Sequence, residues 1–441
     1  MSPVYLSTHL STSVLPVLFK EKSGRLIHMQ SLLILGRQPA LGMAELESLY
    51  GYDVVRPFSG TSALVDIPAD QVAFSRLGGS TRLCKVLTEL SPQWHEVKQY
   101  LLDKIPEHAA LLPEGKLTIG LSLFGIKTHI KELERTLLEI KKVVKQSGRP
   151  VRIVPNKQLE LNSAQVLHNH LTEPGNWELV VVSDGRKAYL TQTVAIQDIE
   201  AYGARDQARP YRDARVGMLP PKLAQVIVNL AVGSAAADEA AKTDLHSSVL
   251  GGPVLDPFCG TGVTLQEATL MGYDSFGTDL EPRMVEYSIG NLHWLRQKWP
   301  DRTDTNVRIE LGDATTHAWH QPIGAVAGET YLGAPLTTLP QRDALNKIIG
   351  GTNAIHEKFL RNLASQLQPG TRLCLAVPAW NTGQSAHTGQ QKPVFTHLPV
   401  LDHLQELGYN RVKFVHADMR DLVYHRENQL VARELVVIVK E

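Results

Sequence analysis

The sequence contains very little cysteine and no excess of charge of either sign. Its three cysteines, Cys84, Cys259 and Cys374, lie far apart and form no Cys-x-x-Cys pair. This spacing argues against a disulfide framework and against a zinc site, and it fits a reducing compartment. Lysine plus arginine and aspartate plus glutamate number 45 each. The chain is therefore not a polycation that coats nucleic acid without regard to sequence, although this balance is compatible with a local basic face.

Long hydrophobic runs are also missing. No uninterrupted apolar stretch approaches the roughly 18 residues that are needed to cross a bilayer. The segment Met1–His28 lacks the basic start and apolar core of a secretory signal, and it shows no periodicity of a helix or strand. We expect it to be an unstructured or dispensable extension. These absences predict a cytoplasmic protein with no membrane partner and no metal centre.

What the sequence does contain is a succession of apolar segments in three blocks. Residues 29–110 begin with a run at 32–36 that is typical of a buried strand, followed by a helix pattern over 41–50. Residues 111–200 form a second α+β block, with strands predicted over 116–123, 151–154, 177–183 and 187–194. From residue 205 to the end, strands alternate with helices, which predicts an α/β fold with a doubly wound, mostly parallel sheet. These strands are predicted over 254–255, 273–277, 307–311, 325–327, 372–377, 412–416 and 435–439, with surface connections over 233–242 and 381–392.

The most informative segment is Val254–Gly262, a strand that ends in Asp-Pro-Phe-Cys-Gly-Thr-Gly and leads into a helix pattern. The glycines Gly260 and Gly262 let the backbone approach a ligand closely, and amides at a helix start can meet a carboxylate. A lone Gly-x-Gly is usually a plain turn. Here it lies between a strand and a helix of a βαβ series, shortly after Asp256, and this context favours a binding site.

Two further acids lie where such a topology binds a nucleoside. Asp279 follows the second strand, 23 residues after Asp256, and an acid at that point can accept both ribose hydroxyls. Asp313 ends the third strand and can accept a hydrogen bond from an adenine amino group. Each acid alone is explained as well by a strand end or a helix cap. The ordered set of three acids with the glycine turn favours binding.

The segment Asp256–Gly262 resembles the first motif of the THUMP-domain RNA (guanine-N2) methyltransferases. Residues 205–231 are similar to the segment that precedes this motif in that family. Further similarities, at 35–37, 44–46, 162–164 and 194–202, involve the family's ferredoxin-like and THUMP modules. The resemblance implies a Rossmann-like class I methyltransferase domain over 205–441, with a mostly parallel sheet and an antiparallel last strand. It also implies a ferredoxin-like module over 29–110 and a THUMP-like RNA-binding module over 111–200.

The resemblance also implies a cofactor, a substrate and a reaction. The cofactor is S-adenosylmethionine, the substrate is tRNA, and the reaction is methylation of the exocyclic N2 of guanosine. A small activator protein or self-association is compatible with it. The residues implied in cofactor binding are Asp256, Pro257, Phe258, Gly260, Gly262, Asp279 and Asp313.

Basic residues give independent support for an RNA partner. Residues 141–159 contain six basic side chains and no acid, a pattern that suits phosphate contacts. The plainer alternative is a solvated helix end, where lysine is favoured by the helix dipole. A second basic cluster lies just before the catalytic block. The predicted RNA-binding residues are Lys141, Lys142, Lys145, Arg149 and Arg152 in the first cluster, with Arg209 and Arg212 in the second.

The chain departs from the family at the fourth motif. Family members carry Asp/Asn-Pro-Pro-Tyr/Phe at the end of the fourth strand, and this chain has Gly-Glu-Thr-Tyr at 328–331. Glu329 and Tyr331 are the residues that we expect to position the target base. Two alternatives stay open: methylation of another amino group, in rRNA or at adenine N6 of DNA, and a catalytically silent RNA-binding protein.

Overall fold

The computed structural model describes residues 30–213, 218–236, 252–320, 322–385, 392–427 and 429–441. The predicted extension Met1–His28 lies outside the described residues. The chain forms two compact units, and their described residues are 30–32, 66–69 and 84–194 in the first, and the remainder in the second. In the described part of the chain, none of the helices combines the length and the apolar character that a membrane span requires.

The first unit is a sheet with two long helices on one face. Strands β6 (Val151–Ile153), β5 (Leu117–Phe124) and β7 (Asn176–Ser183) are parallel neighbours, and β8 (Ala188–Ile196) runs antiparallel to β7. Next to β8 lies β4 (Ser80–Leu90). The four strands predicted in this block are confirmed to within two residues of their ends.

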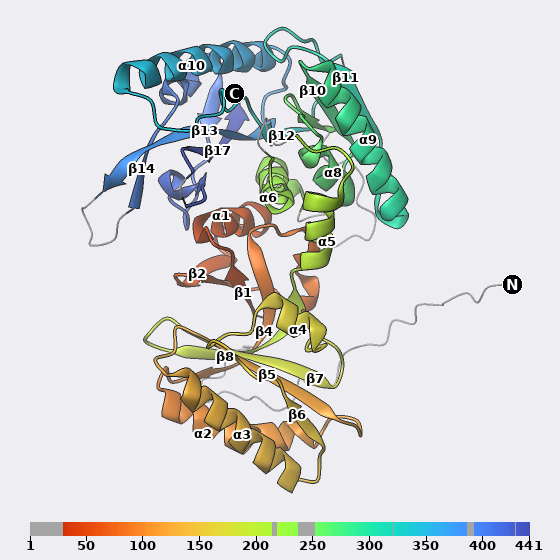
Figure 1. Cartoon of the computed structure of the whole chain (residues 1–441), viewed down its shortest axis with the longest axis vertical. Helices are drawn as coiled ribbons and strands as arrows, with labels where there is room; N and C mark the ends of the chain where they lie inside the picture. The colour runs from red at the N-terminus through yellow and green to blue at the C-terminus, as the bar shows by residue number, and fades with distance from the viewer. Residues whose placement is uncertain (1–29, 214–217, 237–251, 321, 386–391, 428) are drawn as a thin grey trace, which may run out of the picture. The chain divides into compact units, whose positions relative to one another are not determined.

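Helices α2 (Trp94–Ala109) and α3 (Ile130–Gln146) lie side by side on this sheet, and the short α4 (Ser163–His168) follows β6 (Figure 1). Helix α3 buries Leu133, Leu137 and Ile140, which recur at helical spacing and join the core of the unit. Its lysines therefore fall on the opposite, solvent-facing side.

The larger sheet of the second unit has the strand order β11-β10-β9-β12-β13-β17-β15. Strands β9 (Val254–Asp256), β10 (Ser275–Asp279), β11 (Val307–Leu311), β12 (Ala325–Glu329) and β13 (Arg372–Ser385) are parallel, whereas β17 (Val431–Lys440) is antiparallel to β13. The prediction of a mostly parallel α/β sheet with an antiparallel last strand is confirmed. The chain order reverses between β9 and β12, and a crevice forms at the carboxyl ends of strands at such a point.

Helices cover this sheet and connect its strands. Helices α8 (Val263–Leu270) and α9 (Pro282–Lys298) lie beside β10 and β11, and α10 (Arg342–Ala364) is the long helix at the top of Figure 1. The other elements are α5 (Ile199–Gly203), the π-helical η4 (Ala204–Ala208), α6 (Pro221–Val232), β14 (Lys392–Thr396), β15 (Tyr409–Arg411) and β16 (Val423–Tyr424), and 3-10 turns at 69–71, 74–76, 233–236, 300–302, 399–402, 404–407 and 419–421.

Residues 33–65 also belong to this unit. Strands β1 (Ser31–Leu35), β2 (Val55–Ser59) and β3 (Ser62–Val65) accompany α1 (Pro39–Tyr50), which packs on α6. Between these two helices the buried Glu45 accepts hydrogen bonds from the amides of Gly78 and Gly79, both 2.9 Å, and from Asn229 Nδ2, 2.7 Å. Arg76 donates to the same Asn229 side chain at 3.0 Å. Buried polar groups are thereby paired across the α1–α6 contact.

Two sequence-based expectations for this unit are wrong. The strand predicted over 412–416 is instead β15 at Tyr409–Arg411. The amides of Val415 and His416 donate to the Glu47 carboxylate, at 2.6 and 2.9 Å, and so do not pair with a strand. The connection predicted over 381–392 is strand at both ends, since β13 continues to Ser385 and pairs with β14 from Lys392. Residues 386–391 lie outside the described part. Of the connection predicted over 233–242, the described residues 233–236 form a 3-10 turn.

Candidate active site

A cavity of about 710 Å³ lies at the carboxyl ends of β9, β10 and β12. This volume is within the range of small-molecule sites in proteins. Its wall is built from the turn after β9, the tips of β10 and β12, the segment after β11, and one side of α10. Most of the residues predicted to bind cofactor or base lie together in this wall: Asp256, Pro257, Phe258, Gly260, Asp279, Asp313, Glu329 and Tyr331.

Asp256 is the deepest acid of the cavity. Its carboxylate is buried, and Oδ1 accepts a hydrogen bond from the amide of Phe258 at 3.2 Å. A Cβ at Gly328 on the neighbouring strand would lie 2.3 Å from this oxygen, so the carboxylate fits only because residue 328 is glycine. Burial raises the pKa of Asp256 to about 8, and the nearby Asp279 and Glu329 carboxylates push it in the same direction.

The two glycines of the turn have different surroundings. Gly260 has φ 51° and lies in the cavity wall. Gly262 has φ 80° and is not among the lining residues, and a Cβ there would lie 2.8 Å from Ser288 Oγ on α9. The expectation that Gly262 gives room to a ligand is therefore corrected: it gives room to helix α9. The turn is further fixed by Asn291 Nδ2, which donates to the carbonyl of Thr261 at 2.9 Å.

Asp279 ends β10, and the backbone around it holds its carboxylate in place. Oδ2 accepts from the amide of Gly260 at 2.8 Å, and Oδ1 accepts from the amide of Glu281 at 2.9 Å. Burial raises its pKa, and these amides oppose the rise by stabilising the charged form. The adjacent Leu280 is 66% exposed and lines the same cavity. An oriented acid beside an exposed apolar side chain suits a sugar with an attached flat ring.

Asp313 follows β11 on the other side of the cavity. Its Oδ1 accepts from the amide and the hydroxyl of Thr315, at 2.9 and 2.7 Å. The other oxygen, Oδ2, accepts no hydrogen bond within the described residues. The loop thus orients this carboxylate and leaves one oxygen for a donor in the cavity.

At the tip of β12, the Glu329 carboxylate forms an ion pair with Arg433 of β17, in which Arg433 Nε donates to Oε1. Both side chains are largely buried, at 15% and 6% exposure. Burial raises the pKa of Glu329, and the charge of Arg433 opposes the rise. The acid expected to meet the target base therefore lies in the cavity wall, but it already has one partner.

The next two residues face different surroundings. Thr330 is buried, and its hydroxyl lies 2.7 Å from Nε2 of His356 on α10. His356 Nδ1 lies 2.8 Å from the carbonyl of Thr352, and burial lowers the pKa of this histidine to about 4. The neutral ring then donates from Nδ1 and accepts from Thr330 at Nε2. Tyr331, 43% exposed, is a cavity residue.

Sequence reasoning missed the residues that hold this tip. Arg433 interrupts the apolar run of the last strand, which the hydrophobic pattern predicted to begin only at 435, so it was not seen as part of the strand. His356 resembles any core histidine of an amphipathic helix. Lys358 lines the cavity from α10 and was not singled out. The charged pair Arg433-Glu434 between apolar residues of the last strand is the signal that could have identified Arg433.

The residues predicted to bind RNA in the first unit fall into two groups. Lys142 and Lys145 are exposed on α3, and Lys141 is partly exposed. Arg152 is exposed, and its Nη2 donates to Asn169 Oδ1 at 2.7 Å. Arg149 has a structural role. Its Nη1 donates to the carbonyl of Ala109 at the end of α2, and its Nη2 donates to the carbonyl of Pro113 in the segment that follows, both at 2.6 Å. The expectation that Arg149 contacts RNA is corrected accordingly.

The second basic cluster is largely internal. Arg209 is 2% exposed, which contradicts the expected surface contact with phosphate. It follows the π-helical segment η4. Burial lowers the pKa of its guanidinium, and the charges of Asp206 and Glu267 oppose this shift. Arg205 is buried as well and pairs with Glu267 at 2.6 Å. Of the two arginines predicted here, Arg212 is the exposed one.

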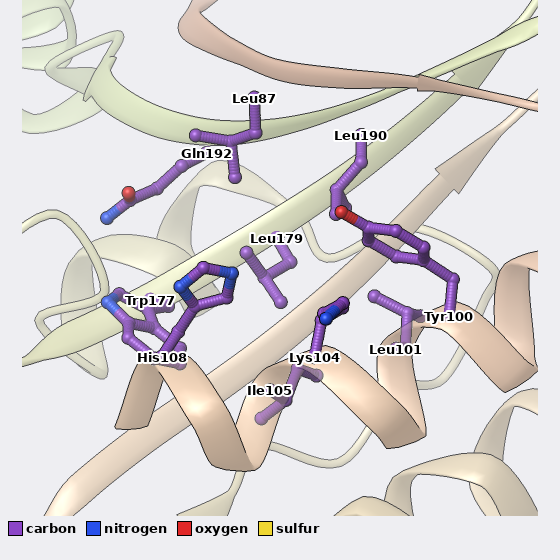
Figure 2. Close-up of a pocket in the computed structure, with 10 residues that line it drawn as sticks. All are labelled: Leu87, Tyr100, Leu101, Lys104, Ile105, His108, Trp177, Leu179, Leu190 and Gln192. Carbon is purple, nitrogen blue, oxygen red and sulfur yellow. The ribbon is translucent and has the colours of Figure 1, made fainter. Parts of the chain in front are cut away.

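A much smaller cavity, of about 40 Å³, lies inside the first unit (Figure 2). Its wall combines Tyr100, Lys104 and His108 of α2 with apolar side chains of the strands, among them Trp177 and Leu190. A space of this size holds a few water molecules at most. The large cavity of the second unit is therefore the candidate active site.

Sequence comparison finds known proteins that match part of this chain. No protein-family model matches the chain. The tRNA (guanine(10)-N2)-dimethyltransferase of Methanothermobacter thermautotrophicus is 28% identical over 201 residues, 45% of this chain and 49% of that protein. The protein of the same name from Pyrococcus abyssi is 29% identical over 188 residues, 42% and 49% of the two chains. The chain thus spans about half the length of the curated relatives it matches.

Among solved structures, TrmN from Thermus thermophilus aligns with a TM-score of 0.47 and 17% identity, covering 94% of this chain and 100% of that one. The α/β fold rests on the strand order and directions described above.

The raised pKa of Asp256 predicts a pH-dependent stability. The folded protein holds this proton between the ordinary value of 3.8 and about 8, where the unfolded chain has released it. The free energy of unfolding therefore falls as pH rises through this window. Asp256→Asn lacks this proton, so its melting temperature relative to the parent should rise from about pH 4 to about pH 8. Scanning fluorimetry measures this difference.

Asp304→Asn is the matched control, because Asp304 is exposed. Its melting temperature should follow that of the parent across the window. If the Asp256→Asn curve also runs parallel to the parent, Asp256 does not carry the retained proton.

Proposed function

We propose that this protein transfers a methyl group from S-adenosylmethionine to the exocyclic N2 of guanosine in tRNA. The observation that carries the proposal is the gathering of the Asp-x-x-x-Gly turn, two strand-end acids and the 329–331 tip around one cavity. The curated relatives named tRNA (guanine(10)-N2)-dimethyltransferase support the choice of reaction and substrate.

Asp279 and Asp313 have the chemistry to hold the nucleoside part of the cofactor. The Asp279 carboxylate, oriented by two amides, accepts both ribose hydroxyls, and charge-assisted hydrogen bonds of this kind are strong. Asp313 Oδ2 accepts from the adenine amine, and Leu280 packs against the ring. S-adenosylmethionine supplies an electrophilic methyl group on a sulfonium. The Glu329 carboxylate makes the cavity a favourable place for that positive charge.

Glu329 and Tyr331 have the chemistry to hold the base. Tyr331 offers an exposed ring for stacking, and Glu329 offers a carboxylate oxygen to a proton of the exocyclic amine. The nitrogen lone pair forms the new N–C bond, and the pair of the broken S–C bond stays on sulfur. The nitrogen then loses a proton to the Glu329 carboxylate, which returns it to water. A base in a stack must be turned out to reach such a site.

The first unit is the proposed RNA-binding part of the protein. Lys141, Lys142 and Lys145 lie along one helix with their charges toward solvent, where they can neutralise phosphates without displacing core residues. No acid is placed among them in the sequence. Such contacts fix the position of the RNA, and the choice of base is left to the cavity of the second unit.

The direct test is nucleoside analysis after a reaction with purified protein. Unmodified tRNA transcripts are incubated with S-adenosylmethionine that carries a deuterated methyl group, and digested nucleosides are identified by mass spectrometry. The proposal predicts labelled N2-methylguanosine. In parallel reactions with rRNA and with DNA, a labelled nucleoside from either would indicate the alternative target. No label on tRNA, rRNA or DNA would indicate a silent RNA-binding protein. Either result contradicts the proposal.

The lysines of α3 predict salt-sensitive RNA binding. Replacing Lys141, Lys142 and Lys145 by alanine should weaken tRNA binding. The slope of the logarithm of the binding constant against the logarithm of salt concentration should become shallower by about two to three, because each phosphate contact releases a counterion. Filter binding at several salt concentrations measures both effects. Affinity for the cofactor should stay unchanged.

The matched control removes three other lysines of the same unit: Lys98, Lys104 and Lys187. Each of them already pairs with a glutamate, at 2.8, 2.7 and 2.8 Å. This variant should keep most of the parent's salt slope. Equal slopes for the α3 variant, the control and the parent would rule out the α3 lysines as the phosphate contacts.

A further inference from the structure

We infer that Arg433 is a positioning residue that keeps the Glu329 carboxylate ionised and turned toward the cavity. Arg433 does not line the cavity itself, so it acts through Glu329. The inference rests on the proposed function, in which Glu329 accepts a proton from the amine.

The geometry of the two strands brings the pair together. Glu329 is the last residue of β12 and is level with Ala376 of β13. Arg433 lies across β13 on β17, level with Pro378. Its side chain therefore reaches over the intervening strand to the β12 tip. The arginine is buried and comes from the sheet itself, so it fixes the direction of the carboxylate. A mobile cation on the surface would not do so.

One carboxylate oxygen is used by this ion pair and the other is not. Arg433 Nε donates to Oε1, and no further hydrogen bond to the Glu329 carboxylate occurs within the described residues. The second oxygen, Oε2, is thus the one that can accept the amine proton. An arginine is suited to holding the carboxylate because it stays charged in proteins and its rigid, planar guanidinium fixes the direction of the hydrogen bond.

The surroundings of Glu329 otherwise favour its protonated form. Burial disfavours the charged carboxylate and raises the pKa of Glu329. From α10, the neutral His356 contacts Thr330, so it supplies no positive charge. Arg433 is the one cation bonded to Glu329 in the described part of the chain. The other charged groups in the cavity wall are Asp279, Glu281, Arg283, Asp313 and Lys358.

Side chains from two other elements hold the tip of β12. Arg433 contacts Glu329 from β17, and His356 contacts Thr330 from α10. Both residues are remote from the tip in sequence, so the tip is positioned by the packing of the whole unit.

The test is a pH profile of single-turnover methyl transfer at saturating cofactor. Loss of the arginine charge in Arg433→Met should lower the rate at pH 7 by about 10- to 100-fold, and the rate should recover as pH rises. The acid limb of the profile should move to higher pH by about one to three units, since an opposite charge lowers the pKa of a carboxylate by that amount. Arg433→Lys should keep the limb near that of the parent, at a reduced rate.

Two controls separate positioning from folding. Arg411→Met removes an arginine that pairs with Glu434, the next residue of β17, at 2.7 Å, so it should leave the profile unchanged. Calorimetry with S-adenosylhomocysteine checks that each variant is folded and binds the product with the parent's affinity. If Arg433→Met does not fold, Arg433→Gln, which keeps donors but not the charge, replaces it.

The outcomes distinguish this inference from the function on which it rests. An active parent with an unshifted limb in the neutral variants contradicts the role of Arg433 and leaves the function intact. A parent that binds the product but methylates no RNA contradicts the function and the inference with it. A shifted limb in the neutral variants, restored by lysine, supports both.

Discussion

The site depends on one constraint, which is that several carboxylates share the carboxyl edge of a parallel sheet away from water. Asp256, Asp279 and Glu329 end three neighbouring strands, and each has its pKa raised by burial. Uncompensated charges there are costly. Backbone amides orient Asp279, an arginine stabilises Glu329, and Asp256 retains its proton. The different partners give the three acids different chemistry although they lie in one cavity.

The same constraint determines which small residues the site requires. Gly328 leaves space for the Asp256 carboxylate, and Gly262 leaves space for Ser288 of α9. Neither glycine lines the cavity. They allow the acid and the helix to approach the backbone closely, and such close packing favours the preorganisation that a group-transfer site needs.

The sequence was sufficient for the parts of the molecule that depend on local pattern. The spacing of apolar residues and the turn-forming residues predicted the α/β alternation and the turn after β9. They also predicted that the acids at 256, 279 and 313 lie at strand ends. The rest depends on contacts between distant segments. Glu47 removes the amides of Val415 and His416 from a predicted strand. Arg149 and Arg209 are basic residues in the sequence but are bound or buried in the fold, and Arg433 finds Glu329 only across β13.

We propose that this cavity holds a nucleoside cofactor through Asp279, and calorimetry with S-adenosylhomocysteine is the most direct test. The parent should bind, and Asp279→Ala should weaken binding by about 2 to 4 kcal/mol, because hydrogen bonds to a charged acceptor are lost. Replacement of the exposed Asp301 by alanine should leave affinity unchanged. A parent that does not bind, or a folded Asp279→Ala variant with full affinity, would contradict this role of Asp279.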